Sequence, residues 1–377
     1  MSERGAIYRR LGVEPIINAT ATVTILGGSL MRPEVLEAMR EASECFVDLT
    51  ELEAAVGARI ATLTRNQAAS VCGGAAAGLF LTAAAAMTRD VPDGVLRVAD
   101  VPSLPHEFVL HRAHHLPELS AVELAGGRFV EIGATGNTTV RELESRIGPR
   151  TAALLYVAGA HVAEGALPVE TFIAVAHSHG LPAIVDAAAQ IPPVSSLWDF
   201  THAGADFAIF SGGKGLRGPA STGLIVGDPA GVARCVANAA PLQRLGRPMK
   251  VGKEDLVGFL TALELELHTD EAATIRGYEA TVERIVAWAR GRSDVRAERE
   301  FPSEAGQPMP RARLTFRGML AAQRDAIIAD LRDGRPRIDV WPAGEDGIYV
   351  NPQTMLEGEE TVVCDRLAWV LSRRSAG

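Results

Sequence analysis

The residues whose types and spacing could carry chemistry begin with one lysine in a glycine-rich turn. Lys214 stands in the segment FAIFSGGKGLRGP (207–219), after an apolar run and three residues after Ser211. Glycines let the backbone approach a bulky planar ligand, and a lysine held away from water becomes a nucleophile. Such a lysine could form an imine with an aldehyde. The simpler alternative is a solvated lysine on an exposed turn.

The scarcity of lysine narrows the choice of nucleophile. Of the 37 basic residues, only Lys214, Lys250 and Lys253 are lysines, and the others are arginines. Arginine can replace lysine as a charge, but it cannot form an imine with an aldehyde. An imine-forming site therefore has three candidates in this chain.

An acidic residue 28 positions before Lys214 could act together with it. Asp186 ends the apolar run of the segment LPAIVDAAAQ (181–190). A carboxylate at the end of a buried strand can pair with a protonated pyridine nitrogen and make the ring a stronger electron sink. Capping of the next segment is the alternative role, and the residues alone leave both open.

A third feature could bind a phosphate group. The segment VCGGAAAG (71–78) passes from a strand through Gly73 and Gly74 into an alanine-rich helix that begins near Ala75. Free amides at the start of a helix bind phosphate, assisted by the helix dipole. A packed turn is the alternative. A lysine, an acid and a glycine turn on one alternating chain favour a common site.

Strands and helices alternate around these segments. Short apolar runs separated by helical patterns favour a mainly parallel sheet covered by helices on both faces. Helices are predicted over 32–46 and 50–63. The predicted strands are Ala68–Cys72, Val95–Ala99, Phe108–Leu110, Arg128–Ile132, Ala152–Val157, Ala183–Val185, Phe207–Phe210 and Gly223–Val226.

The chain is long enough for two domains. Its 377 residues, with 47% apolar composition, exceed the usual size of one compact domain. Proline, glycine and basic residues gather near 241–252, which favours an N-terminal segment 1–28, a large domain 29–250 and a small α+β domain 251–377. The small domain is predicted to contain an amphipathic stretch at 253–290, strands Arg311–Phe316, Arg337–Trp341 and Ile348–Asn351, and helices near 320–333 and 358–372.

Charge and cysteine content argue against several classes of protein. A net charge of −9 without long runs of one sign disfavours nucleic-acid binding. The four cysteines lack the close spacing of a metal knuckle, so we expect reduced thiols and no metal site. The segment MSERG (1–5) lacks the order of a signal peptide, and no apolar run is long enough to cross a bilayer. We expect a cytoplasmic protein without membrane partners.

Several segments together resemble a known family. They are INATATVT (17–24) with LGGS (26–29), VDAAA (185–189), SGGKGLRGP (211–219), GRPMKVGKE (246–254) and GIYVNP (347–352). The chain resembles the fold-type I enzymes that use pyridoxal-5′-phosphate (PLP), in the group similar to selenocysteine synthase and D-glucosaminate-6-phosphate ammonia lyase. The resemblance implies a three-layer α/β large domain with a mainly parallel sheet, and a smaller α+β C-terminal domain.

The resemblance implies roles for four of the candidate residues. Lys214 would form the Schiff base with the PLP aldehyde, and Asp186 would pair with the pyridine nitrogen. His114, in the segment LHRAHH (110–115), matches a family position near the ring. Lys253, like Lys250, lies in a segment that relatives bring close to the cofactor and that could reach it across a homodimer. A surface histidine and solvated lysines are the alternatives.

The phosphate would be held by Gly73, Gly74 and Ala75 together with Ser211. Relatives often have a hydroxyl residue before the glycine turn, whereas this chain has Cys72. Backbone amides would therefore carry more of the binding. Selenocysteine synthase also has an additional N-terminal segment that binds tRNA, whereas here the 17–24 motif follows the start almost at once, so we expect no nucleic-acid partner.

The resemblance implies a PLP-dependent lyase that acts on a small hydroxylated amino acid or amino-sugar acid by α,β-elimination. An amino-acid racemase or an aldolase would use the same lysine and acid, and stays an alternative. A non-catalytic protein of this fold would be expected to lose Lys214 or Asp186. A nucleotide-binding oxidoreductase is disfavoured because no Gly-x-Gly-x-x-Gly turn follows a first strand.

Overall fold

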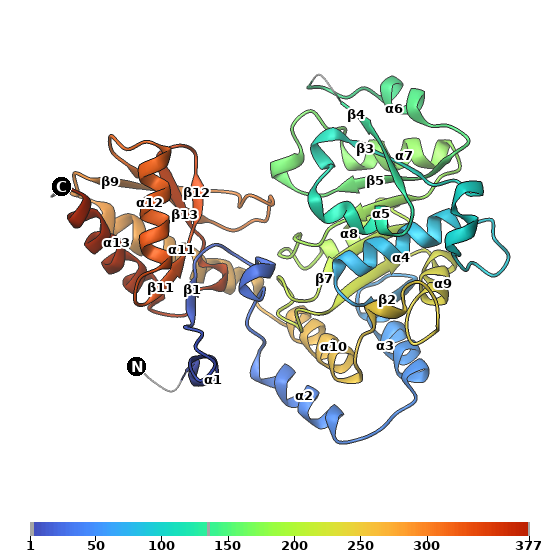
Figure 1. The fold of residues 1–377 in the computed structure, drawn as a ribbon, viewed down its shortest axis with the longest axis horizontal. Coiled ribbons are helices and arrows are strands. Elements are labelled where there is room, and N and C mark those ends of the chain that lie inside the picture. The colour runs from blue at the N-terminus through green and yellow to red at the C-terminus, as the bar shows by residue number, and fades with distance from the viewer. Residues whose placement is uncertain (1–3, 134–135, 376–377) are drawn as a thin grey trace. The chain divides into compact units, whose positions relative to one another are not determined.

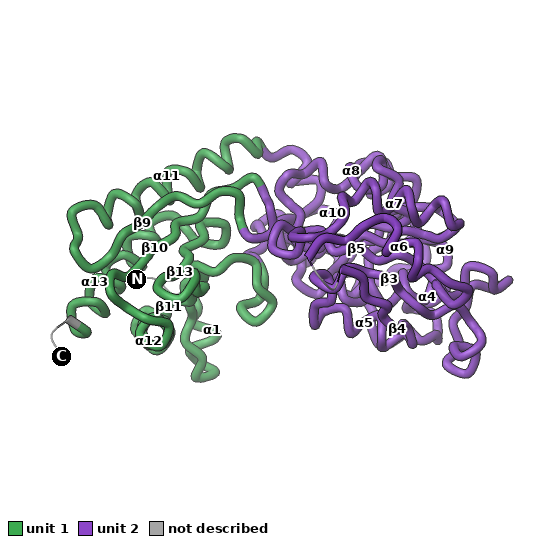
Figure 2. The backbone as a smooth tube through the Cα atoms, turned by 90° about the horizontal axis from the view of Figure 1, so that it is seen from above, with its two compact units in different colours: residues 1–28, 270–303, 308–377 green, residues 29–269, 304–307 purple. Residues whose placement is uncertain are grey.

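Residues 4–133 and 136–375 are described by the computed structural model, and the chain divides into two compact units (Figure 2). The larger unit holds residues 29–269 and 304–307, and the smaller unit holds residues 1–28, 270–303 and 308–377. Residues 1–3, part of the start segment considered above, lie outside the described residues. The domain boundaries expected at residues 28 and 250 stay predictions.

A seven-stranded sheet forms the centre of the larger unit. Its strands are β2 (Ala68–Cys72), β3 (Glu107–His111), β4 (Arg128–Ile132), β5 (Thr151–Val157), β6 (Ala183–Asp186), β7 (Phe207–Ser211) and β8 (Gly223–Gly227). They lie in the order β2-β8-β7-β6-β5-β3-β4. All neighbours run parallel except β8, which is antiparallel to both β2 and β7. The mainly parallel sheet is therefore confirmed.

Helices cover both faces of this sheet, which gives the three expected layers (Figure 1). One face carries α4 (Ala75–Met87), α5 (Ser120–Leu124) and α9 (Pro229–Asn238). The other carries α3 (Leu49–Leu63), α6 (Val140–Arg146), α7 (Val169–Ser178), α8 (Ser196–His202) and α10 (Lys253–Leu267). The remaining helix, α2 (Pro33–Ser43), packs against α10.

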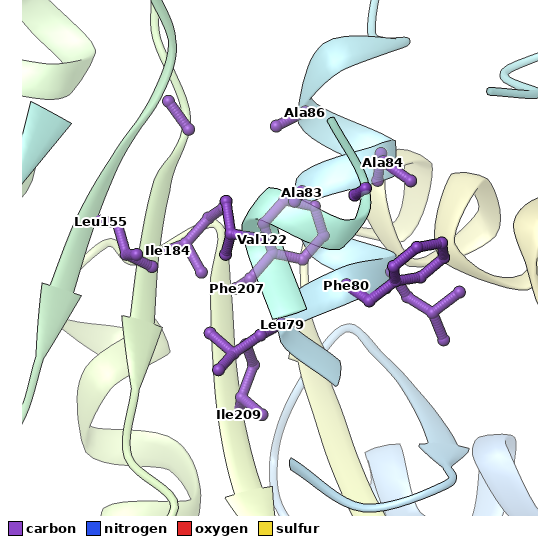
Figure 3. Packing of buried hydrophobic residues seen from close by; sticks show 14 of the residues in the cluster. Leu79, Phe80, Ala83, Ala84, Ala86, Val122, Leu155, Ile184, Phe207 and Ile209 are labelled. Atoms are coloured by element: carbon purple, nitrogen blue, oxygen red, sulfur yellow. The ribbon is translucent and has the colours of Figure 1, made fainter. Parts of the chain in front are cut away.

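The side chains of β7 pack alternately against the helices on the two faces of the sheet. Phe207 and Ile209 pack into one apolar cluster, and Ala208 and Phe210 into the other. Successive strand residues point to opposite faces, so a strand buried on both sides is apolar at every position. Figure 3 shows Phe207 and Ile209 beside Leu79 of α4 in the first cluster.

Helix α4 is buried along nearly its whole length. From Ala77 to Met87 every residue is buried, as expected of a helix that is apolar all round. Gly78 lets the helix approach the sheet, since a Cβ there would lie 2.8 Å from a methyl group of Ile209. The exposed side chain of Ala76 leaves the N-terminal turn as the accessible part of α4.

The strand predicted at Val95–Ala99 is wrong. Val95 and Leu96 are buried, which explains the apolar pattern, but the chain then forms a 3-10 helix over Val98–Ser103. The amides that a strand would pair are used locally: Val95 N–H donates to Asp93 Oδ1, and Leu96 N–H donates to Asn238 Oδ1. The connection between α4 and β3 is therefore buried only at Val95 and Leu96, and Val98 is exposed.

The smaller unit combines an antiparallel sheet with long helices. Four strands lie in the order β12-β13-β10-β9, and β1 pairs in parallel with β11. Apolar residues of α11, α12 and α13 pack against them in one core. The elements are α1 (Ala6–Arg9), β1 (Ile16–Asn18), α11 (Glu271–Ala289), β9 (Val295–Glu300), β10 (Arg311–Phe316), α12 (Ala321–Arg332), β11 (Arg337–Asp339), β12 (Trp341–Ala343), β13 (Gly347–Val350) and α13 (Glu359–Ser375).

Two predicted elements of this region are divided in the structure. The stretch 253–290 forms α10 and α11, because Asp270 caps a new helix by accepting from Ala273 N–H. The strand expected at 337–341 forms β11 and β12, which join different sheets. Within the described residues, no helix is both long and apolar enough to cross a membrane.

Candidate active site

The strand register brings the candidate segments to one side of the large sheet, the edge formed by the carboxyl ends of its parallel strands. Gly223, the first residue of antiparallel β8, pairs with Cys72 on one side and with Ser211 on the other. Asp186 ends β6 and is level with Val157, the last residue of β5. The carboxyl ends of parallel strands are where α/β proteins bind ligands. The glycine turn, Ser211 and Asp186 therefore follow one another along this edge.

Lys214 lies in the turn that follows β7, and it is half-buried. Among the described residues, none forms a hydrogen bond or an ion pair with its ammonium group. The glycines of this turn serve close packing within the chain. A Cβ at Gly213 would lie 2.5 Å from Ala220 Cα, and one at Gly215 would lie 2.2 Å from the Ile191 carbonyl oxygen. The turn is thus fixed by its backbone, and the lysine amine remains available.

Asp186 is a buried carboxylate, with only 6% of its surface exposed. Burial raises its pKa, while the hydrogen bond from Ala188 N–H to Oδ1 at 3.0 Å and the nearby positive charge of Lys214 lower it. Glu118 raises it further. A carboxylate removed from water in this way needs a positive partner, which a protonated ring nitrogen would supply.

Gly74 gives the N-terminus of α4 an open approach. Its backbone has φ 92° and ψ 162°, a conformation essentially restricted to glycine, and no side chain caps the helix. A Cβ at Gly74 would meet no atom within 4 Å. At Gly223, by contrast, a Cβ would lie 2.7 Å from the amide nitrogen of Ala75. The first amides of α4 therefore lie directly above β8 and next to open space.

The other glycine of this turn contacts a segment far along the chain. A Cβ at Gly73 would lie 2.6 Å from the carbonyl oxygen of Met249, so the 3-10 helix Arg247–Met249 packs on the glycine turn. The Nε atom of Arg247 is buried without a hydrogen-bond partner in the described structure. Cys72 donates through Sγ to the Gly74 carbonyl at 3.3 Å, so the thiol braces the turn from within.

His114 is fully buried beside the same edge. Its Nδ1 accepts a hydrogen bond from Val157 N–H at 3.2 Å, which places the imidazole proton on Nε2. That Nε2 has no hydrogen-bond partner among the described residues. Burial, followed by the nearby His111, lowers the pKa of His114 to about 3, so the ring is neutral at physiological pH. Val157 is level with Asp186, but Ala158 N–H bonds to the Asp186 carbonyl, so the Val157 N–H points to the opposite side of β5 and His114 lies across that strand from the carboxylate.

Within one chain, neither Lys253 nor Lys250 bonds to the other candidate residues of the site. Lys253 Nζ donates to the Ala42 carbonyl at 2.5 Å and to Glu254 Oε1 at 2.6 Å, which ties the start of α10 to the end of α2. Lys250 is exposed. A contact between Lys253 and the cofactor of another subunit stays a prediction.

The residues along this edge fit a ligand with three different chemical groups. An aldehyde matches the unpartnered amine of Lys214, a protonated pyridine nitrogen matches buried Asp186, and a phosphate matches the uncapped N-terminus of α4 at Gly74. PLP has all three groups. No cluster of three or more metal-ligating side chains occurs in the described ranges.

Comparison with known proteins agrees with this geometry. The aminotransferase class-V family model matches residues 102–254. D-glucosaminate-6-phosphate ammonia lyase of Salmonella typhimurium is 33% identical over 369 residues, covering 96% of each chain. A solved structure of a D-glucosaminate-6-phosphate ammonia-lyase superimposes with a TM-score of 0.83 at 32% identity, covering 97% of this chain and 98% of the other.

Two further relatives have other activities. The 5′-C-glycyluridine monooxygenase-decarboxylase of a Streptomyces species is 33% identical, covering 94% of this chain and 90% of its own. The L-seryl-tRNA(Sec) selenium transferase of Desulfomicrobium baculatum is 26% identical, covering 99% and 87%.

Fold, site geometry and sequence similarity together define a fold-type I enzyme whose cofactor is PLP. The chain belongs to the family that includes D-glucosaminate-6-phosphate ammonia lyase, with selenocysteine synthase as a more distant member. The expectation of a PLP-dependent lyase is confirmed by the ammonia lyase, which matches in both sequence and structure.

Sequence reasoning missed several groups that shape this site. The amide of Val157 and the carbonyl of Met249 are backbone groups, and no residue type signals them in the sequence. Gly223 was assigned only to a strand, although its lack of a side chain allows β8 to meet α4. His111 was not considered as a candidate although it lies close to His114 in the sequence. The feature that marks it is its burial, which a sequence does not show.

Proposed function

We propose that this protein catalyses PLP-dependent α,β-elimination from a small hydroxylated amino acid or amino-sugar acid, with release of ammonia. One observation carries the proposal: an unpartnered lysine amine, a buried carboxylate and an uncapped helix start share one sheet edge in a chain that is 33% identical to an ammonia lyase over its length. The substrate of that relative is an amino-sugar acid phosphate by name.

In this proposal the chain's own residues bind and orient the cofactor. Lys214 Nζ would hold the aldehyde of PLP, and Asp186 would hold the proton on the ring nitrogen. Gly73, Gly74 and Ala75, with Ser211, bind the phosphate through the amides at the start of α4. The resemblance also implies a place near the ring for His114, whose uncharged imidazole would add no positive charge there. When bound, PLP supplies the electron sink for a carbanion at the substrate α-carbon.

Lys214 also moves the protons of the reaction. Once a substrate amine has taken the place of Lys214 on the cofactor, the free lysine amine would remove the proton from the substrate α-carbon. The same ammonium then donates a proton to the departing β-hydroxyl group, which leaves as water. Lys214 would then take the place of the product amine on the cofactor again, which frees the enamine. Hydrolysis of the enamine gives a 2-keto product and ammonia, and it consumes the one water that the elimination released.

A second candidate reaction is decarboxylation, because the monooxygenase-decarboxylase is as similar to this chain as the ammonia lyase is. Lys214 and Asp186 would serve either reaction, since both pass through a carbanion at the same carbon. Incubation with amino-sugar acids and β-hydroxy amino acids tests the two proposals together. Ammonia and keto product in equal amounts support elimination. Release of carbon dioxide with uptake of oxygen supports the alternative, and loss of optical rotation alone would indicate a racemase.

We also propose that the active form is a cytoplasmic homodimer or larger homo-oligomer with sites at the subunit boundary, and that it has no nucleic-acid partner. Several apolar side chains of the larger unit are uncovered, with Phe46 fully exposed and Val47 and Leu36 about half exposed. Exposed apolar groups of this kind favour association. Arg247, Lys250 and Lys253 would reach the neighbouring site. Sedimentation of an active monomer would contradict the proposal.

A further inference from the structure

The segment LGGS (26–29) is one of the motifs by which the chain resembles its family, and it ends at Ser29. In the structure Ser29 is half-buried and lies against the turn that carries Lys214. Its N–H and its Oγ both donate to the Gly213 carbonyl, each at 2.9 Å. One residue thus supplies two hydrogen bonds to a single acceptor that lies 184 positions further along the chain.

The bonded carbonyl belongs to the peptide group that joins Gly213 to Lys214. A peptide group is planar, so hydrogen bonds to its oxygen also fix the plane that contains the amide and the Cα atom of Lys214. The next carbonyl, that of Lys214 itself, accepts from Arg217 N–H at 3.0 Å. Both peptide planes that flank the Lys214 Cα atom are therefore held by hydrogen bonds. Together they set the direction in which the side chain leaves the backbone.

Arg217 returns from the far end of the turn to the residue after Ser29. Its backbone is left-handed, with φ 56°, a conformation that few residues other than glycine adopt. Its Nε donates to the Leu30 carbonyl at 3.1 Å. Strained backbone of this kind persists where the surrounding contacts over-determine it. Residues 29 and 30 are therefore bonded to the turn on both sides of Lys214.

These bonds matter for the lysine amine because its own contacts do not fix it. Among the described residues, none bonds to Lys214 Nζ. The position of the amine thus follows from the backbone of the turn and from the rotamers of the side chain. A nucleophile reacts efficiently only when it is held near its target in the correct orientation. The hydrogen bonds that hold the Gly213 carbonyl are therefore part of the reactivity of Lys214.

We propose that Ser29 is a positioning residue for Lys214: by bonding twice to the Gly213 carbonyl, it orients the lysine amine toward the aldehyde of PLP. The inference rests on the proposed role of Lys214 and deepens it. Ser29 acts through the lysine, because its hydroxyl donates to the turn. Alanine at this position keeps the N–H bond and removes the hydroxyl bond, whereas threonine keeps both.

Titration of the apoprotein with PLP, followed by absorbance, tests the proposal without reference to turnover. Ser29→Ala should weaken PLP affinity by about 2- to 10-fold, which corresponds to the loss of one hydrogen bond. Ser29→Thr should keep the parent affinity. Ser178→Ala is the matched control, because it removes a hydroxyl that donates to a backbone carbonyl, that of Val175 at 2.8 Å, within α7. It should also keep the parent affinity. Parent affinity in Ser29→Ala would overturn the proposal.

A second background shows whether Ser29 acts through Lys214. PLP can bind to Lys214→Ala only without a covalent bond, so adding Ser29→Ala to that variant should leave its PLP affinity unchanged. An equal loss of affinity in both backgrounds would overturn the proposal, because it would reveal a general change in the fold. Borohydride labelling of Ser29→Ala separates the two roles. Label on Lys250 or Lys253 would contradict the proposed roles of both residues, whereas label on Lys214 together with parent affinity would contradict that of Ser29 alone.

Discussion

The substitution Gly74→Ala tests whether the glycine turn binds the cofactor or only packs within the chain. In this structure, backbone strain is the one source of the free energy that the substitution costs. Gly74 adopts φ 92° and ψ 162°, which alanine reaches only under backbone strain of about 1–3 kcal/mol. The added Cβ would meet no atom within 4 Å, so steric overlap contributes nothing to that cost. The strain therefore either remains in the folded protein or is relieved by a change in the turn.

These two outcomes have different signatures. Strain that remains lowers the free energy of unfolding of the apoprotein by about 1–3 kcal/mol. Strain that is relieved moves the amides at the start of α4, and PLP binding must then restore the turn, which weakens binding by about 5- to 150-fold for the same free energy. The loss of stability and the loss of PLP affinity should together account for about 1–3 kcal/mol. A methyl group in contact with the phosphate would weaken binding further.

Urea unfolding of the apoprotein and titration with PLP, followed by absorbance, measure the two quantities. Gly180→Ala is the matched control, since Gly180 also has a positive φ of 66° and open space around a Cβ, but lies before β6 at the opposite edge of the sheet. The left-handed backbone should cost alanine about 1–2 kcal/mol of stability at this position and leave PLP affinity unchanged. Parent stability and parent PLP affinity in Gly74→Ala would refute the assignment of the glycine turn and the N-terminus of α4 as the phosphate site.

Three further predictions follow from the buried groups and the exposed basic segment. Burial raises the pKa of Asp186, so ionisation of this carboxyl destabilises the apoprotein as pH rises. Asp186→Asn should therefore raise the urea midpoint of the apoprotein at pH 7, and raise it less in acid. The same variant should retain PLP more weakly. Iodoacetamide should modify exposed Cys45 alone in the native protein, because burial raises the pKa of both Cys72 and Cys364 to about 12; labelling of Cys72 would contradict the structure. Mixing inactive Lys214→Ala with an inactive Lys253→Ala variant should restore partial activity, and no rescue despite subunit exchange would exclude shared sites.

The elements that carry the site could be predicted because their sequences are locally consistent. Four apolar residues before Ser211 and three before Asp186 are buried strands, and each places its polar residue at the carboxyl edge. The fold class followed from the alternation of such runs with helices. Lys214 stood out because few lysines compete with it.

The parts that could not be predicted depend on long-range contacts. Val95 and Leu96 look like a strand because they are buried, but their amides bond to Asp93 and Asn238. Charged residues dominate β9 (Val295–Glu300), so its sequence has no apolar alternation. The glycines after Ser211 were explained by the approach of a ligand, whereas in the structure Gly213 and Gly215 are required by Ala220 and Ile191.

Reduction of the purified protein with borohydride, followed by peptide mapping, tests the central claim most directly. The chain has three lysines, so the position of the reduced PLP adduct identifies the attachment site without ambiguity. The account predicts a near-visible absorbance band that borohydride abolishes, with the whole label on the peptide that contains Lys214. Label on Lys250 or Lys253, or no label in protein saturated with PLP, would contradict the account.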